Sequence, residues 1–501
     1  MLDGQKKIII IGSGLGGLAC GAILAKNGYN VAVLEQSVQI GGCLQCFTRR
    51  GVRFETGMHF IGSAAKGQTL DKLMRYLEIS KAVHLAPLNT DGYDVVSLGG
   101  KRYKFTTGRE AFINQMSEYF PDQRANIVRY RNLIDEISSA SSLHSLKYAE
   151  SDAPLNTEYQ LRSIDDVIGS LVTDPTLANV LVGNLPLYAA AKGKTPFATH
   201  AFIMDFYNQS SFRIVGGSDC VAAALTRTIE NYGGSVVTRQ KVTRIVCDDT
   251  HATGVEVNDE TFMPADYVIS DAHPSVTLQL TDSHLLRPAF RKRIDAVPQT
   301  VGCFSVYLHF KNNAVPYMNY NYYGYNADTP WGCENYTDAD WPKGFLYMHF
   351  CQKEKPVFAQ TGVVLSYMRF DDVARWQDTA VGHRGADYED FKRHKAELLI
   401  ASLEKHFPGI TANIENYYTS SPLTYLNYTG TLRGAMYGIA KDVSLGAAGR
   451  VPHRTKIPNL FLTGQNINSH GMLGVLVGAI VTCSEFVPAK TIYQQISEAN
   501  E

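Results

Sequence analysis

The sequence predicts an α/β fold in which a domain built on a parallel sheet is interrupted by a second, α+β region. Residues 8–11 form a short apolar run that is too brief for a globular helix. Gly12, Gly14 and Gly17 follow it at the G-x-G-x-x-G spacing. A second apolar run then ends in Glu35. Together these features describe a strand, a glycine turn, a helix and a second strand, which is the unit that binds a dinucleotide.

Each part of this unit has a physical role. Gly12 permits the tight turn out of the strand, Gly14 lets the backbone approach a pyrophosphate, and Gly17 lets the helix pack close to the sheet. The free N–H groups and the dipole of the helix N-terminus favour the negative charge of the phosphates. A carboxylate at Glu35 can accept hydrogen bonds from ribose hydroxyls. The residues expected to contact the dinucleotide are Gly12, Ser13, Gly14, Leu15, Gly16, Gly17, Glu35 and Gln36.

The next segment resembles a known family. Paired Gly41 and Gly42 follow the second strand, and residues 54–62 read FETGMHFIG. This pattern resembles the FAD-binding start of the amine oxidase and phytoene desaturase superfamily. Carotenoid desaturases usually have arginine after the paired glycines, whereas this chain has Cys43. Gly-Gly-Cys and the FETGMHFIG stretch are instead similar to the retinol saturases, also called all-trans-retinol 13,14-reductases, which have aspartate in place of Glu55.

The resemblance continues towards the C-terminus. Further counterparts of retinol saturase blocks are residues 212–218, 321–329, 384–392 and 421–424. Residues 457–466, followed by 471–474, resemble the second FAD motif, in which a strand ends in a glycine turn beside the ribityl chain and a helix points at the pyrophosphate. The family commonly has aspartate where this chain has Asn466, so a ribityl contact there would rest on hydrogen bonding without charge.

The resemblance implies further FAD contacts and a fold. The implied contacts are Gly41, Gly42, Cys43, Val242, Gly464, Gln465, Asn466, Gly471, Met472 and Leu473. The contact of Val242 would be a backbone contact with adenine, and the alternative is an ordinary strand residue. The implied fold is a Rossmann-type FAD-binding domain of the glutathione-reductase-like superfamily with an inserted α+β substrate domain. We expect the FAD-binding domain to comprise residues 1–85, 213–285 and 440–501, and the substrate domain to comprise residues 86–212 and 286–439.

The pattern of apolar residues predicts the elements of the later regions. Residues 213–273 contain short alternating runs, which indicate a small antiparallel ribbon feeding a strand. Residues 86–212 are expected to be largely helical, with one strand pair near 92–105. Strands of a half-buried sheet and a helix packed on it are expected at 301–310, 344–351, 363–370 and 388–407. Five tyrosines could wall a channel for a long apolar ligand, although sheet packing is the favoured interpretation: Tyr317, Tyr320, Tyr322, Tyr323 and Tyr325.

Composition excludes several classes of function. The chain has 501 residues, of which 45% are hydrophobic, and a net charge of -1, so nothing indicates a nucleic-acid partner. Nine cysteines, an odd number, favour a reducing compartment over a disulfide framework. Residues 8–25 carry no charge, but five glycines and the following acid-terminated strand argue against a membrane helix or a signal peptide. We therefore expect cytoplasmic residence, with peripheral membrane contact left open.

The implied chemistry is hydride transfer from reduced flavin to a carbon-carbon double bond of a retinoid, carotenoid or similar isoprenoid lipid. A proton must reach the neighbouring carbon. His59 is the first candidate donor, with a structural histidine as the alternative, and Glu55 and His470 are weaker candidates. Glu55 could instead anchor the backbone. Cys43 and Cys46 form a C-x-x-C, for which packing near the flavin is favoured over a redox or metal site, so no metal is expected.

Two questions stay open at the level of the sequence. Only one G-x-G-x-x-G is found, so electrons would come from NAD(P)H visiting the flavin or from a carrier protein, without a second nucleotide domain. Two alternatives to the reductase also remain. One is a desaturase or cis-trans isomerase of carotenoid type. The other is a non-catalytic prenyl-binding protein on the same fold, against which the intact glycine motif argues.

Overall fold

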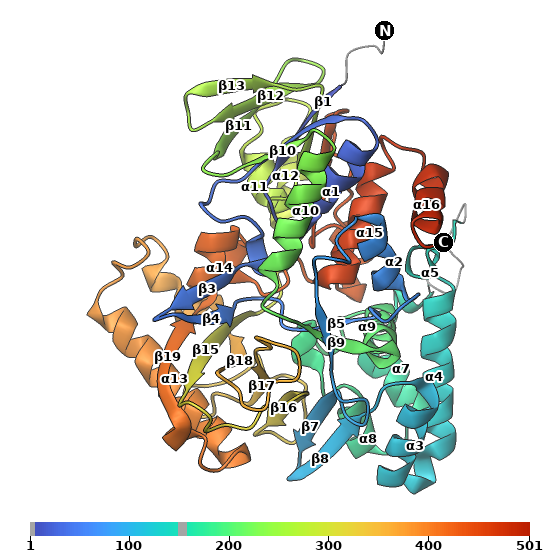
Figure 1. Ribbon diagram of the computed structural model, residues 1–501, viewed down its shortest axis with the longest axis vertical. Coiled ribbons are helices and arrows are strands. Elements are labelled where there is room, and N and C mark those ends of the chain that lie inside the picture. Colours follow the sequence, from blue (N-terminus) through green and yellow to red (C-terminus); the bar gives the residue numbers. More distant parts are fainter. Residues whose placement is uncertain (1–5, 149–157) are drawn as a thin grey trace.

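The computed structural model describes residues 6–148 and 158–501. Figure 1 shows a parallel sheet in the upper part of the molecule and a larger mixed sheet in the lower part. The five strands of the parallel sheet lie in the order β10 (Ser235–Val237), β2 (Asn30–Leu34), β1 (Lys7–Ile11), β14 (Tyr267–Ser270) and β20 (Leu460–Leu462). Segments far apart in the sequence therefore meet in one sheet, as the predicted discontinuous domain requires. The predicted domain boundaries themselves stay a prediction.

Three helices cover the parallel sheet near its centre. They are α1 (Leu15–Lys26), α10 (Asp219–Asn231) and α15 (Gly471–Cys483). Both α10 and α15 pack on α1. Ile8 and Ile10 of β1 belong to the core shared with these helices, whereas Ile9 belongs to the core on the opposite face. A strand that is buried on both faces must be apolar throughout, which explains the continuous apolar run at 8–11.

The predicted antiparallel ribbon is confirmed. It consists of β11 (Val242–Cys247), β12 (Ala252–Val257) and β13 (Thr261–Pro264), and the chain passes from it into β14. Val242 opens β11 and is 6% exposed. Its side chain packs in the core under the ribbon.

The mixed sheet has seven strands. Their order is β19 (Ile414–Ser420), β15 (Gly302–Phe310), β18 (Thr361–Met368), β17 (Gly344–His349), β16 (Asn321–Tyr325), β7 (Asp94–Leu98) and β8 (Lys101–Phe105). The strand pair expected near 92–105 is the antiparallel pair β7 and β8. It joins the sheet through a parallel pairing of β7 with β16.

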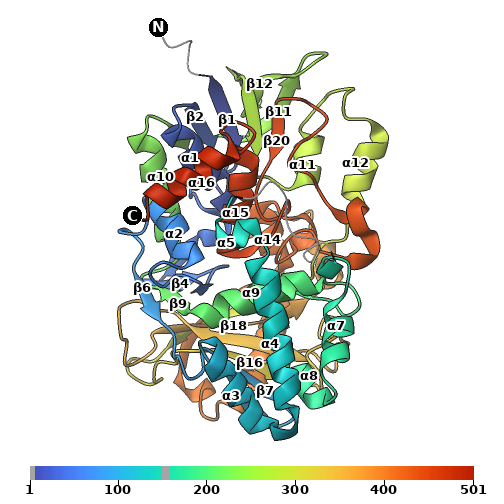
Figure 2. The ribbon, with the colours of Figure 1, turned by 90° about the vertical axis from the view of Figure 1, so that its right-hand side faces the viewer.

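The expectation of a half-buried sheet is wrong, because both faces are covered. Tyr323 and Leu346 face a core shared with α3 (Arg109–Tyr119), α4 (Arg124–Ser139) and α9 (Phe197–Gln209). Tyr322 and Tyr347 face the opposite core, which α13 (Ala386–His406) closes. Figure 2 shows α4 and α9 standing in front of this sheet. The tyrosines of β16 and β17 are buried together with their aliphatic neighbours, so neither face of these strands is exposed to solvent.

The helical region and the tyrosine cluster agree with the predictions. Further helices that precede residue 197 in the sequence are α2 (Thr69–Tyr76), α5 (Ser142–Ser145), α7 (Ile164–Leu171) and α8 (Pro175–Leu181). The expected helix at 388–407 is α13. None of the five clustered tyrosines borders the large cavity described below, and Tyr322 and Tyr323 are fully buried in β16. Sheet packing is therefore confirmed as their role.

Two small sheets connect the two large ones. The first pairs β3 (Cys46–Arg49) with β4 (Val52–Glu55), and the second places β9 (Ser211–Ile214) between β5 (Ile61–Gly62) and β6 (Leu85–Pro87). The remaining helices are α11 (Pro274–Gln279), α12 (Pro288–Asp295), α14 (Pro422–Thr429) and α16 (Ala489–Glu498). Among the helices of the described residues, none has the length and apolar character needed to cross a membrane.

Candidate functional site

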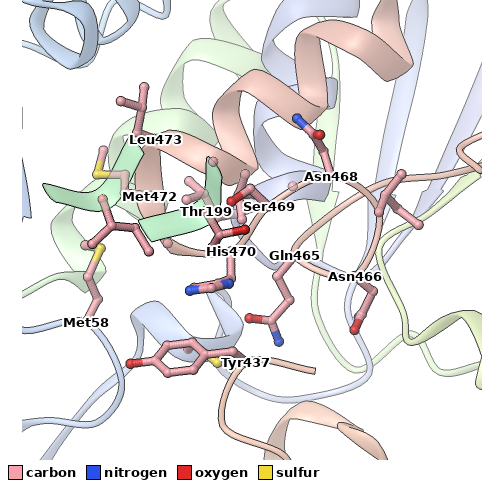
Figure 3. A pocket seen from close by; sticks show the side chains of 18 of the residues that line it. Met58, Thr199, Tyr437, Gln465, Asn466, Asn468, Ser469, His470, Met472 and Leu473 are labelled. Atoms are coloured by element: carbon pink, nitrogen blue, oxygen red, sulfur yellow. The ribbon is translucent and has the colours of Figure 1, made fainter. Parts of the chain in front are cut away.

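One large cavity lies where the two halves of the molecule meet. Its volume is about 1150 Å³, and Figure 3 shows part of its wall. Gly14 and Gly42 border one end, and Leu346 and Met348 of β17 border the other. The cavity therefore connects the predicted dinucleotide turn with the seven-stranded sheet.

The glycine turn is built as the sequence predicts. Gly12 has a φ of 95°, in the left-handed region that favours glycine. A Cβ on Gly16 would lie 2.7 Å from the Cα of Gly464, and a Cβ on Gly17 would overlap the carbonyl oxygen of Gly12. The turn is thus packed against backbone on two sides, and helix α1 starts directly from it with its N-terminus at the cavity.

The second pair of glycines faces the first turn. Gly41 and Gly42 have φ values of 108° and 54°, and they lead into a short 3-10 helix, Gly42–Leu44. The N–H of Gly41 donates to the carbonyl of Ser13 at 3.0 Å. A Cβ on Gly42 would lie 3.4 Å from the Cα of Gly14. Two stretches of bare backbone therefore face each other across the end of the cavity.

Glu35 is held at the carboxyl end of β2. Its Oε2 accepts hydrogen bonds from the N–H and the hydroxyl of Ser13, at 3.0 Å and 2.6 Å. Its Oε1 accepts from the N–H of Ser37 at 2.8 Å. The carboxylate is buried and fixed next to the glycine turn, the position in which a ribose acceptor is expected.

The C-terminal motif completes this end of the cavity. Gly464, with a φ of 88°, follows β20, and α15 begins at Gly471 beside the cavity. Figure 3 shows Gln465 and His470 projecting into the same space as Tyr437. The ring centroids of Tyr437 and His470 are 4.5 Å apart. The glycine turn and the helix start that the resemblance implied are both present.

The side chain of Asn466, for which the resemblance implied a ribityl contact, is hydrogen-bonded to the protein backbone. Its Oδ1 accepts a hydrogen bond from the N–H of Ile439 at 3.0 Å. A Cβ on Gly438 would overlap the same oxygen. The side chain therefore braces the 438–439 backbone, which explains how an uncharged residue serves where the family commonly has aspartate.

The predicted contacts divide into two groups. Those that border the cavity are Gly14, Leu15, Gly16, Gly41, Gly42, Cys43, Gln465, Asn466, Gly471, Met472 and Leu473. Those set behind its wall are Gly12, Ser13, Gly17, Glu35, Gln36, Val242 and Gly464. Gln36 is exposed to solvent. The cavity-facing group includes five glycines and the start of two helices, so this end has both the room and the N–H donors that an extended dinucleotide such as FAD requires.

Glu55 and His59 form a pair beside the cavity. His59 borders the cavity, and its Nδ1 lies 3.5 Å from the Oε2 of Glu55. Both side chains are nearly buried, at 9% and 4% exposed. Burial raises the pKa of Glu55, and the hydrogen bond to His59 opposes that rise. Sequence reasoning named both residues, and the structure brings them together.

Arg213 fixes the backbone on which His59 lies. It is only 1% exposed, and its guanidinium donates to the carbonyl of His59 at 3.2 Å and to the carbonyl of Tyr320 at 3.1 Å. Its charge also lowers the pKa of Glu55 and of Asp94, against the larger effect of burial. A buried arginine thus ties the His59 segment to the strand end of the seven-stranded sheet.

The C-x-x-C thiols have raised pKa values. Burial raises the pKa of Cys43 to about 11 and that of Cys46 to about 12. Both thiols are therefore protonated, whereas a redox or metal site needs thiolates. Among the described residues, no group of three His, Cys, Asp or Glu side chains is placed to hold a metal ion. Cys43 borders the cavity and Cys46 packs near Ser218.

The other end of the cavity is apolar. Leu346, Met348 and Leu365 come from β17 and β18, and Phe202 and Ile203 come from α9. The two residues of α9 are separated from the three strand residues by more than a hundred positions in the sequence. Sequence reasoning predicted their strands and the helical region but did not bring them to one wall.

Sequence reasoning also missed charged residues of the cavity, among them Asp271 and Lys441. Asp271 follows β14 directly, and Lys441 lies in the segment before the second FAD motif. Burial raises the pKa of Asp271 to about 7 and lowers the pKa of Lys441 to about 8. Asp271 could have been found, because ligands bind at the carboxyl ends of parallel strands and the ribbon within residues 213–273 was expected to feed a strand. Lys441 follows no recognisable pattern.

Comparisons with known proteins agree with this geometry. The family described as Flavin containing amine oxidoreductase matches residues 15–382. The chain is 29% identical to the All-trans-retinol 13,14-reductase of Rattus norvegicus, over 97% of this chain and 86% of that protein. It is 24% identical to Prolycopene isomerase 1, chloroplastic, of an Oncidium hybrid cultivar, over 96% of this chain and 83% of that protein.

Solved structures share the fold. The crystal structure of an oxidoreductase from Methanosarcina mazei matches with a TM-score of 0.64 and 16% identity, covering 95% of this chain and 100% of that one. The predicted Rossmann-type FAD-binding fold and the predicted resemblance are thus confirmed. The chain belongs to the flavin-containing amine oxidoreductase family and is an FAD-dependent oxidoreductase.

Proposed function

We propose that this protein reduces one carbon-carbon double bond of an apolar polyene or isoprenoid lipid such as a retinoid or carotenoid. The observation that carries the proposal is the apolar wall of Leu346, Met348, Leu365 and Ile203. This wall lies in the same cavity as the glycine cradle, by which we mean the backbone of Gly14, Gly16 and Gly42. The similarity to a protein named All-trans-retinol 13,14-reductase supports the same substrate class. Bound FAD supplies hydride transfer at this site.

The charge of the cavity argues against an amine substrate, despite the family's description. The charged side chains that border the cavity include Arg293, Lys441 and Arg450, and the one carboxyl group among the described lining residues is Asp271. That carboxyl sits at the glycine turn, away from the apolar wall. A cationic amine would find no carboxylate partner among the described residues of the apolar wall, which costs binding free energy.

The residues of the chain have three tasks in such a reaction. The apolar wall excludes water and places the double bond, which contributes most when an alkene offers little charge to stabilise. Gly14, Gly16 and Gly42 would hold FAD against the backbone. Gln465 and His470 border the space between the cradle and the wall and would contact the ring system.

His59 is our candidate for the proton donor. Its Nδ1 faces Glu55, and its Nε2 has no hydrogen-bond partner in the part of the chain that the structure describes. Glu55 would hold the ring in place, and Nε2 would deliver the proton at the cavity wall. His470 is unsuited to this task, because burial lowers its pKa to about 3 and leaves it uncharged at neutral pH.

Lys441 is a second candidate donor, favoured by one observation. It borders the cavity, and a pKa of about 8 leaves it protonated at pH 7 but close to the range in which general acids work best. The two candidates are separable. If His59 is the donor, Lys441→Met retains most of the turnover and His59→Asn does not; the opposite result would transfer the role to Lys441.

The deciding experiment follows the flavin without oxygen. The purified protein is reduced, all-trans-retinol or a carotenoid is added, and the flavin absorbance and the mass of the lipid are recorded. We expect reoxidation of the flavin and a lipid heavier by two hydrogens. A lipid of unchanged mass but altered geometry would establish an isomerase, and a lipid lighter by two hydrogens, formed by the oxidised protein, would establish a desaturase.

The isomerase alternative has an observation of its own, since the chain is similar to a protein named Prolycopene isomerase over nearly its whole length.

The electron donor is part of the proposal: either NAD(P)H or a reduced carrier protein would serve. Mixing the oxidised protein with NADH or NADPH under the same conditions tests the first. Contact with a membrane surface is likewise proposed only as a route by which an apolar substrate would enter, and vesicle flotation tests it.

A further inference from the structure

Asp271 lies beneath the glycine turn. It is the first residue after β14, so it stands at the carboxyl end of the parallel sheet, and it borders the cavity. A Cβ on Gly16 would lie 2.5 Å from its Oδ1, and Cβ atoms on Gly14 and Gly464 would overlap its carboxyl oxygens. The carboxyl group therefore lies between Gly14 and Gly16 of the glycine cradle and Gly464 of the second FAD motif.

The surroundings of this carboxyl oppose its ionisation. Burial raises the pKa of Asp271 to about 7, the N–H of Gly17 lowers it, and the charge of Glu35 at the end of β2 raises it further. Two other titratable groups lie close by. The thiol of Cys43 is protonated, and burial lowers the pKa of His273, so neither offsets the carboxylate.

The cationic side chains that border the cavity do not interact with the carboxyl group of Asp271. Arg293 donates to the carbonyls of Ala448 and Arg450. Burial and then Arg450 lower the pKa of Lys441, which shows that these two cations are near each other, and neither contributes to the pKa of Asp271. Within the described residues, the carboxyl therefore has backbone N–H groups and a second acid as its electrostatic neighbours.

We propose that Asp271 makes FAD binding depend on a proton: the cofactor binds when this carboxyl is protonated, and binding above neutral pH takes up one proton. An ionised carboxylate at the N-terminus of α1 would compete with the pyrophosphate for the same N–H groups and repel it. A protonated carboxyl removes the repulsion and can donate a hydrogen bond to a phosphate oxygen. The inference depends on FAD binding and not on the identity of the substrate.

The first test is the affinity for FAD as a function of pH. The full chain is stripped of flavin and titrated with FAD between pH 5.5 and 9, and quenching of flavin fluorescence reports binding. We expect a constant dissociation constant below about pH 6 and an increase of about tenfold per pH unit above about pH 7, the slope for one proton. Asp271→Asn should bind FAD with little dependence on pH and more tightly than the unaltered protein at pH 9.

The control is Asp282→Asn, which removes an exposed carboxylate further along the same segment. It should keep the pH dependence of the unaltered protein. If Asp271→Asn also keeps that dependence, the proposal is wrong. If Asp271→Asn binds FAD no better than the unaltered protein at pH 9, the carboxylate does not repel the cofactor and the proposal is equally wrong.

A second measurement needs no variant. Calorimetric titration of FAD into the stripped protein at pH 8, in two buffers with different enthalpies of ionisation, gives the number of protons taken up. We expect a value close to one. A value of zero overturns the proposal even if the Asn variant does not fold. Because neither measurement involves a lipid, failure of the proposed reductase activity would leave both results interpretable.

Discussion

The two ends of the cavity are built in different ways. At the FAD end, backbone atoms of Gly14, Gly16 and Gly42 form the wall, and two helices start there. At the other end, side chains of Leu346 and Ile203 form the wall, and they come from elements that meet only in the folded protein. A site made of backbone needs particular residues at fixed spacing, whereas a site made of apolar side chains needs only their volume.

This difference decides how each end responds to change. At the FAD end a single methyl group meets backbone, which cannot rotate away. At the apolar end a changed side chain meets other side chains, which can rearrange, so substitutions should alter the preferred substrate before they abolish binding. The following predictions test that contrast.

The largest effect is expected for Gly16→Ala. Its Cβ would lie 2.7 Å and 2.8 Å from the Cα and N atoms of Gly464, so the turn or α1 has to shift. Overpacking of this kind costs about 3 kcal/mol at the upper end, which is about 100-fold in FAD affinity. The protein should be isolated without its yellow colour and without activity. Gly169→Ala is the matched control, because nothing lies within 4 Å of its added Cβ.

The FAD end is also the part that the sequence predicts best. The order of strand, turn, helix and acid is local, so Gly12 to Glu35 could be assigned from spacing alone, and the structure has β1, α1 and β2 where expected. Asp271 was missed because its carboxyl reaches the turn from a strand more than two hundred residues later. Long-range parallel pairing of strands β1 and β14 creates that contact, so only the expected strand end, and no motif around Asp271 itself, pointed to this residue.

For the apolar end, the sequence predicted the secondary-structure elements but not which of their residues line the cavity. The strands β17 and β18 were expected, but which of their residues face the cavity depends on the register between them. The covering by α9 also depends on packing that the periodicity of one segment cannot show. His59 and Glu55 were found because a family motif contains both, whereas Lys441 lies in no motif.

A smaller but still large effect is expected for His59→Asn. Loss of a general acid lowers turnover by about 100-fold or more. FAD should stay bound, since His59 is not part of the glycine cradle, and an unchanged flavin spectrum checks this. Glu55→Gln should lower turnover less, because it alters the group that faces the Nδ1 of His59 but leaves the ring itself in place. Turnover unchanged in both variants would show that this pair is structural.

A selective effect is expected for Ile203→Trp at the apolar end. Ile203 is half-buried on α9 and borders the cavity, so the larger ring would take up volume without entering the core. We expect kcat/KM for a long polyene to fall by about tenfold, while a short polyene alcohol is reduced as before. Ile203→Leu serves as the volume-matched control. Equal losses for long and short substrates would place the substrate elsewhere.

The smallest effect on turnover is expected for Asp94→Asn, which acts on the stability of the substrate half. Asp94 is fully buried in β7, its Oδ1 accepts from the amide of Asn321 at 2.7 Å, and its Oδ2 has no partner within the described residues. Burial raises its pKa to about 7 from 3.8. Between these two values the folded protein holds a proton that the unfolded chain releases, so this group makes stability fall as pH rises from about 4 to about 7.

Asparagine cannot ionise, so the variant should lack that part of the decline. Relative to the unaltered protein, Asp94→Asn should gain roughly 2 to 4 kcal/mol of unfolding free energy between pH 4 and pH 8. Denaturant unfolding of both proteins at both pH values, without FAD, measures the gain. The pH dependence that Asp271 contributes is the same in both proteins, so it cancels in the difference. Two acids with similarly raised pKa values would then be separated by their consequences: Asp271 changes how tightly FAD is held, and Asp94 changes only how stable the fold is.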